Sequence, residues 1–121
     1  MTLEEAVGIA IQLQQNEQWV AAGDLYRQIL EVAPDYADAL HFYGVLLHQE
    51  GHSDKAVELI ERSLELESDR ADWHSNLAIV LRDRLEFDRA IASCRRAIAL
   101  DPEHANAHNN LGVLLKTQGH A

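Results

Sequence analysis

Apolar residues recur along the chain at the spacing of amphipathic helices, in paired stretches that are separated by short breaks. The stretch from Leu40 to Leu47 has its apolar positions at i, i+3, i+4 and i+7, and after a break at Gly51 the same spacing resumes from Ala56. No stretch of useful length alternates as a strand would. The pattern therefore predicts an all-α chain with about seven helices, at roughly 3–15, 19–32, 37–49, 53–66, 71–83, 87–100 and 105–117.

The helical pattern repeats every 34 residues without an insertion. A fixed period of this length is typical of proteins built from stacked two-helix units. The matching positions hold small residues in two columns and large apolar residues in others. They are Ala22, Ala56 and Ala90; Gly44, Ala78 and Gly112; Leu30, Leu64 and Ile98; and Leu13, Leu47, Leu81 and Leu115.

Small residues and turn residues predict how each helix pair closes. Gly44, Ala78 and Gly112 are expected to let the two helices of a unit approach closely, so leucine at any of these positions should overpack the pair. Gly51 is expected to end its helix in the left-handed conformation. Pro34 and Pro102 should stop the second helices, because proline lacks the N–H that continues a helix.

These residues resemble the signature of the tetratricopeptide repeat family. One unit contains Leu40, Tyr43–Gly44 and Leu47, followed by Ala56 and Ile60; the next contains His74, Leu77–Ala78 and Leu81, followed by Ala90, Cys94 and Pro102. The resemblance implies a right-handed superhelix (α-solenoid) of antiparallel helix pairs. It divides a single array over 1–121 into units 3–36, 37–70 and 71–104 with a partial unit 105–121, and we interpret the chain as a fragment of a longer protein.

Several phrases are similar to the arrays found in front of bacterial glycosyltransferase domains of the SPINDLY or O-GlcNAc transferase type. They include Leu25–Leu30 and His108–Gly112. This narrower resemblance implies that the chain is the substrate-recognition or scaffolding part of a larger enzyme.

In the family, the first helix of each unit lines a concave surface that holds an extended peptide. Carried over by register, this implies a peptide-binding groove made of His41, Phe42, Val45, His48, Gln49, Asp72, Ser75, Asn76, Ile79, Arg82, Asn106, Asn109, Asn110, Val113 and Lys116. Asp83 is expected to face inward with them. Asn76 and Asn110 share one position in successive units, where family members use an asparagine ladder to bind a peptide backbone.

Two observations limit that expectation. Phe42 occupies the asparagine position of its unit and breaks the ladder, and asparagines on a helix face are also ordinary solvated residues. The family's carboxylate clamp for chaperone tails is missing, because its lysine and arginine positions hold residues such as Val45 and Asn76. Chaperone-tail binding is therefore disfavoured.

Composition and charge narrow the partners. The 121 residues carry a formal net charge of −10, with 10 Lys and Arg against 20 Asp and Glu, so nucleic acid and anionic membrane are poor partners. Residues 3–36 and 37–70 each sum to −5, and the rest of the chain is nearly neutral. This acidic half either attracts a basic partner or is a solvated outer surface, and we favour the second interpretation.

The sequence contains little evidence for a metal site or for catalytic residues. His104 and His108 have the i, i+4 spacing of two metal ligands, but His104 should precede its helix and no further ligand motif is present. Cys94 occupies a large apolar position, which favours a role in the core, and Trp19 and Trp73 are interpreted as packing residues. We predict no metal, no cofactor and no catalytic residues.

The leading prediction is thus a non-catalytic, cytoplasmic module that binds a protein or peptide in its groove. The alternative is structural self-association, because Leu111, Leu114 and Leu115 on the last helix lack the second helix that would cover them. Such a homo-oligomer would form through the C-terminal helix.

Overall fold

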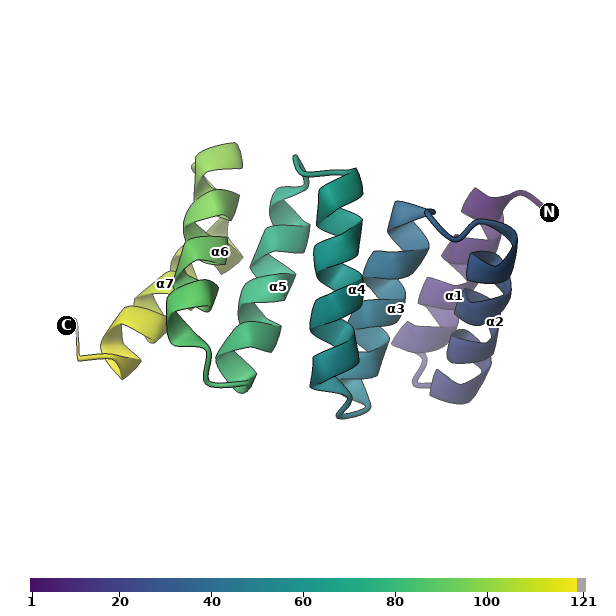
Figure 1. Cartoon of the computed structure of the whole chain (residues 1–121), viewed down its shortest axis with the longest axis horizontal. Helices are drawn as coiled ribbons and strands as arrows, with labels where there is room; N and C mark the ends of the chain where they lie inside the picture. The colour runs from purple at the N-terminus through teal and green to yellow at the C-terminus, as the bar shows by residue number, and fades with distance from the viewer. Residues whose placement is uncertain (120–121) are drawn as a thin grey trace. The chain divides into compact units, whose positions relative to one another are not determined.

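The computed structural model describes residues 1–119, and all regular structure in this range is α-helical. The helices are α1 (Leu3–Gln15), α2 (Trp19–Val32), α3 (Ala37–Gln49), α4 (Ser53–Leu66), α5 (Ala71–Asp83), α6 (Phe87–Leu100) and α7 (Ala105–Thr117) (Figure 1). All seven predicted ranges are confirmed. None of these helices combines the length and the apolar character that crossing a bilayer requires.

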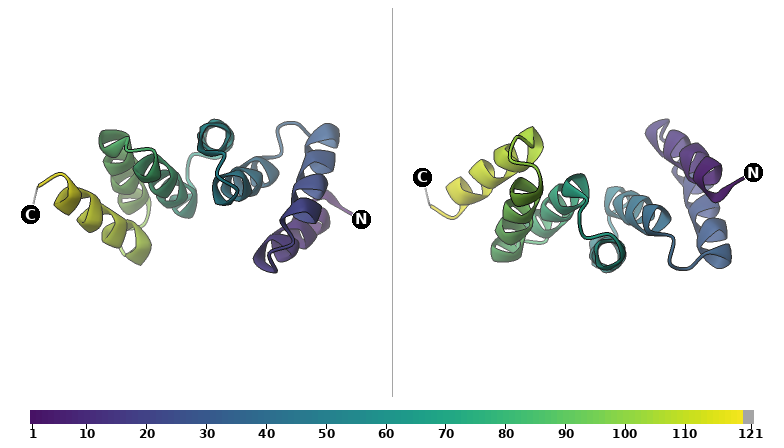
Figure 2. Two further views of the ribbon diagram at one scale, coloured as in Figure 1. Left: turned by 90° about the horizontal axis from the view of Figure 1, so that it is seen from below. Right: turned by 90° about the horizontal axis from the view of Figure 1, so that it is seen from above.

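The helices belong to two compact units. The first unit, Met1–Leu66, contains α1 to α4, and the second unit begins at Glu67 and contains α5 to α7. In the first unit α1 packs on α2 and α3 on α4, and α3 also contacts α1 and α2; in the second unit α5 packs on α6, and α7 contacts both. The views in Figure 2 show consecutive helices of each unit folding back on one another.

Apolar side chains from α1, α2 and α3 form two buried clusters in the first unit. One cluster includes Val7 and Ile29, and a second includes Tyr26 and Leu46, all of them buried. The ring of Tyr26 stacks on that of Tyr43, with 5.8 Å between their centroids. These contacts are the interior faces that the helical periodicity predicts.

Gly44 is the point of closest approach between α3 and α4. A Cβ atom at Gly44 would lie 2.7 Å from Cγ1 of Ile60 and 3.2 Å from the carbonyl oxygen of Ala56, which confirms the close contact. At Gly112 the expectation is wrong, because a Cβ atom there would meet no atom within 4 Å. Among residues 1–119, no second helix packs against this side of α7, so Gly112 has no neighbour to accommodate.

The helices α1, α3, α5 and α7, which are the first helices of the 34-residue repeats, end in the same left-handed turn. The residues after the C-cap are Glu17, Gly51, Leu85 and Gly119, spaced 34 apart, with φ values of 61°, 90°, 63° and 78°. At Gly51 the following amide, that of His52, donates to the carbonyl of Leu47 at 2.7 Å, which is the 6→1 bond of a Schellman motif. The expectation for Gly51 is confirmed, and the same turn also forms at two residues that bear side chains.

The loops before α3, α5 and α7 each present a carbonyl that accepts a side-chain hydrogen bond. Nε2 of His74 lies 3.0 Å from the oxygen of Ser68, and Nε2 of His108 lies 2.7 Å from the oxygen of Pro102. The residue that corresponds to these two histidines on α3 is Leu40, whose side chain has no hydrogen-bond donor. There Nη2 of Arg62, from α4, donates to the oxygen of Pro34 at 3.1 Å.

Candidate functional site

The predicted groove residues of the second unit lie on α5 and α7, which contact each other. We call this surface the amide face. Its exposed members are Asp72, Asn106, Asn109, Val113 and Lys116, its half-buried members are Asn76, Ile79, Arg82 and Asn110, and Ser75 is buried. The two helices therefore bring most of the predicted residues to one accessible surface, whereas Ser75 is covered.

Ser75 supports this surface from below. Nδ2 of Asn110 donates to the Ser75 hydroxyl over 3.4 Å, so the buried hydroxyl on α5 contacts the side-chain amide on α7. A buried hydroxyl needs such a partner, because its desolvation is otherwise uncompensated. Ser75 is thus a positioning residue for Asn110 and does not itself face a ligand.

His104 connects the two helices at their N-terminal ends. Its Nδ1 accepts a hydrogen bond from the amide of Ala107 at 3.1 Å and caps α7, while its Nε2 lies 2.6 Å from Oδ1 of Asp72 on α5. The amide donor requires a lone pair on Nδ1, so the proton sits on Nε2 and is donated to the carboxylate. The expectation that His104 precedes its helix is confirmed, and its ring is occupied by these two contacts.

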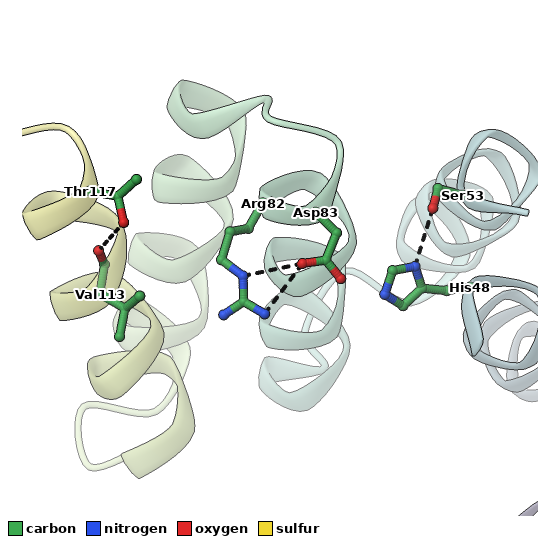
Figure 3. A network of polar contacts seen from close by, with 6 residues as sticks. All are labelled: His48, Ser53, Arg82, Asp83, Val113 and Thr117. Carbon is green, nitrogen blue, oxygen red and sulfur yellow. Dashed lines mark hydrogen bonds and ion pairs between the residues drawn. The ribbon is translucent and has the colours of Figure 1, made fainter. Parts of the chain in front are cut away.

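Cationic side chains stand in the last turn of both helices. Arg82 on α5 and Lys116 on α7 are 34 residues apart. Nε and Nη2 of Arg82 each lie 3.4 Å from Oδ1 of the adjacent Asp83 (Figure 3). The hydroxyl of Thr117 donates to the carbonyl of Val113 at 2.9 Å in the same helix.

The predicted groove residues of the first unit are less accessible. His41 is fully buried, and the edge of its ring lies against Phe42 with 4.9 Å between centroids. Phe42 is half-buried and packs against both core clusters of α1 and α2. The sequence places both side chains at a ligand surface, but packing within the unit takes up His41 completely and Phe42 in part.

Val45 and His48 are half-buried and Gln49 is exposed. Nδ1 of His48 lies 3.4 Å from the hydroxyl of Ser53, which joins α3 to the start of α4 (Figure 3). The three predicted groove residues in the C-terminal half of α3 therefore remain at least partly accessible.

A polar network that the sequence pattern misses joins the three helices of this core. The Tyr26 hydroxyl donates to Oε1 of Gln14 at 2.7 Å, and Nε2 of Gln14 donates to Oε1 of Gln49 at 2.9 Å. Burial raises the pKa of Tyr26, because the charged phenolate loses its hydration. Gln14 occupies a position on the core side of α1, and a polar residue at a core position was the signal available in the sequence.

Two further expectations concern core residues. Cys94 is fully buried on α6, and burial raises the pKa of its thiol, so its role as a packing residue is confirmed. Trp73 is also buried, and the guanidinium carbon of Arg70 lies 3.9 Å from the centre of its ring. Trp19 is half-buried and packs on the Tyr26 cluster.

The last helix differs from its expected state. Leu114 is fully buried, and Leu111 and Leu115 are half-buried, so the prediction of three uncovered leucines is wrong for Leu114. Leu115 borders a hollow between α6 and α7 with a volume of about 360 Å³. The accessible hollow in this part of the second unit therefore lies between α6 and α7 and not along α7 alone.

Within the described residues, seven helices packed in consecutive pairs with one 34-residue register define an α-helical repeat protein of two-helix units. The pattern of a family described as tetratricopeptide repeat matches residues 13–79, and that of a family described as TPR repeat matches residues 80–119. The chain belongs to the tetratricopeptide repeat family. Members of this family generally bind proteins, and no catalytic domain is evident in these 121 residues.

Comparison with solved structures places the chain among several repeat proteins. It is similar to an O-GlcNAc transferase from Thermobaculum terrenum, with 30% identity and a TM-score of 0.89 over 93% of this chain and 22% of that one. The fold also matches PilF of Pseudomonas aeruginosa, with 22% identity and a TM-score of 0.89 over 97% of this chain and 54% of that one.

A third similar structure is the TPR domain of Sgt2 from Aspergillus fumigatus, with 17% identity and a TM-score of 0.89 over 97% of this chain and 79% of that one. A search of curated proteins found no match. The chain thus spans less than a quarter of the length of the O-GlcNAc transferase that it resembles.

Proposed function

We propose that the chain is a non-catalytic interaction module whose amide face holds an extended polypeptide segment. The observation that carries the proposal is the shared register of α5 and α7. Asn76 and Asn110, Ile79 and Val113, and Arg82 and Lys116 form three pairs of like residues, each pair 34 residues apart on helices in contact.

Each pair supplies a different interaction with a peptide. A primary amide both donates and accepts hydrogen bonds, so it can pair with a peptide group whatever the neighbouring side chain is. The Asn110 amide uses one of its hydrogens on Ser75, and a primary amide has a second hydrogen and an acceptor oxygen besides. Ile79 and Val113 offer apolar surface, and Arg82 and Lys116 favour an acidic residue at that end of the segment.

The binding test removes both amides. Peptides are first selected from a random display library on the full 121-residue chain, and the Asn76→Ala, Asn110→Ala double variant is then titrated with them. We expect an affinity loss of about tenfold or more, because one or two net hydrogen bonds contribute about 1 kcal/mol each.

The control for this test is Gln28→Ala, which removes an exposed amide from α2, outside the amide face. Circular dichroism verifies that both variants are folded. Unchanged affinity of a folded double variant for every selected peptide would refute the proposal.

We further propose that this module recognises substrates for a larger glycosyltransferase. The support is the 30% identity to the repeat-containing O-GlcNAc transferase, which extends over 93% of this chain. The test is the gene sequence beyond residue 121 followed by a sugar-transfer assay of its whole product. A gene without a transferase domain would end this part of the proposal and leave the peptide-binding test unaffected.

A further inference from the structure

The hollow between α6 and α7 is lined by side chains of mixed character. Ile91, Ala92 and Leu115 form its apolar part, and Asp88, Arg95 and Gln118 form its polar part. Asp88 and Arg95 are exposed, and neither forms an ion pair with another residue of the range 1–119. Of the other charged residues nearby, Arg84 and Arg89 both bind Glu86, at 2.6 and 2.7 Å, whereas Arg96 is exposed.

Asp88 and Arg95 stand on the same side of α6. A spacing of seven residues returns to nearly the same direction after two turns and separates the two residues by about 10 Å along the axis. Ala92 lies on the same stripe between the two charges and is exposed, and Ala99, also exposed, continues the stripe beyond Arg95. Ile91 and Leu115 border this stripe on the side of α7.

This arrangement is complementary to itself. Asp88 and Arg95 are equally distant from the midpoint between Ile91 and Ala92. If a second α6 runs antiparallel to the first across a two-fold axis at this midpoint, each Asp88 meets the Arg95 of the other copy. A single two-fold contact thus forms two ion pairs, as isologous interfaces require.

We infer that the α6–α7 surface binds a second copy of this chain, with Asp88 of each copy paired with Arg95 of the other. The half-buried side chain of Leu115 and the exposed side chain of Ala92 lose water in this contact, which supplies the apolar part of the association, whereas Ile91 is already buried. The inference does not depend on the peptide-binding proposal, because the amide face lies on α5 and α7 and contains neither charged residue.

Charge reversal on the full 121-residue chain tests the inference by sedimentation equilibrium over micromolar to millimolar concentrations. We expect the wild-type chain to dimerise. Asp88→Arg and Arg95→Asp should each weaken the dimer about tenfold or more, because each change turns two attractive pairs into two repulsive ones. Lys55→Glu on α4 is the matched control, since it is also an exposed charge reversal and should leave the dimer intact.

Two combinations distinguish this geometry from general charge effects. The double variant Asp88→Arg, Arg95→Asp restores both pairs in exchanged form and should dimerise as the wild type does. An equimolar mixture of the two single variants should form a heterodimer, because one copy then carries two cations and the other two anions. A monomeric wild type at all concentrations, or single reversals without effect, or a mixture that stays monomeric would each overturn the inference.

Discussion

At the scale of single residues, the same repeat position has different physical meanings along the chain. The column His41, Ser75 and Asn109 is buried, buried and exposed in turn. Ser75 is in contact with Asn110 of α7, whereas no described helix follows α7 to cover Asn109. A residue's register predicts its direction, but its exposure depends on the element packed against it.

Gly44 and Gly112 occupy one column and should respond to alanine in opposite ways. Alanine raises helix propensity equally at both, by about 0.5–1 kcal/mol. At Gly44 the new Cβ collides with Ile60 and with the backbone of α4, so we expect a net loss of about 1–2 kcal/mol in the free energy of unfolding. At Gly112 the Cβ meets nothing, and we expect a gain.

Urea unfolding of Gly44→Ala and Gly112→Ala measures both effects on the same protein. The difference between the two variants isolates the collision, because their propensity terms cancel. Equal effects at the two positions would show that α3 and α4 are not in close contact at Gly44.

At the scale of helices, elements are joined by polar contacts as well as by apolar packing. The Gln14–Tyr26 bond connects α1 to α2, and Gln14 reaches α3 through Gln49. Removing one partner of a buried bond leaves the other without compensation, whereas removing both avoids that cost.

We expect Tyr26→Phe to lower the free energy of unfolding by about 1–2 kcal/mol, because buried Oε1 of Gln14 then lacks its donor. In the double variant Gln14→Leu, Tyr26→Phe the loss should be smaller than the sum of the single losses. A chemical-denaturation cycle measures this coupling, and strictly additive losses would contradict the bond.

The pH dependence of stability follows from the raised pKa of Tyr26. Burial keeps the folded phenol neutral, so the stabilising effect of the neutral form is complete below the unfolded pKa of about 10 and is lost as the pH rises beyond it. The Tyr26→Phe variant should lack this part of the alkaline loss in pH-dependent unfolding.

The predicted helix ranges match the structure, in part because particular residues mark the ends and in part because the 34-residue register carries those ends to the other repeats. Proline at positions 34 and 102, glycine at 51 and apolar spacing in each stretch all indicate the same ends. The left-handed turns at Glu17 and Leu85 carry no such signal, because their residue types disfavour a positive φ; the 34-residue register alone relates them to Gly51. The Gln14 network and the covering of His41 depend on which side chains meet, and no single-helix pattern contains that information.

At the scale of the molecule, helices of one unit differ in how much of their surface is buried. In the second unit α5 has six buried residues, including Trp73 and Leu77, whereas α7 has two, Ala107 and Leu114. Local opening costs less where fewer side chains must be exposed. The fold is therefore graded in stability even though its repeats follow one pattern.

We expect the backbone amides of α7 to exchange with deuterium faster than those of α5. Hydrogen exchange followed by mass spectrometry, at concentrations low enough to keep the chain monomeric, measures this order. At high concentration the exchange of α6 and α7 should slow if the proposed dimer forms. Equal exchange in α5 and α7 of the monomer would contradict the graded stability.

The loop carbonyls of Pro34, Ser68 and Pro102 show that repeats can differ in sequence and still keep the same hydrogen bond to the loop. Two of these carbonyls accept a hydrogen bond from a histidine of the next helix, and the third accepts one from Arg62, which lies on a helix farther along the chain. The acceptor belongs to the backbone and is fixed by the turn, so the donor is free to come from a different position in each unit. A position-by-position comparison of the repeat sequences therefore underestimates their structural similarity. To graft one repeat into another array, the distant donor residue must be transferred together with the loop.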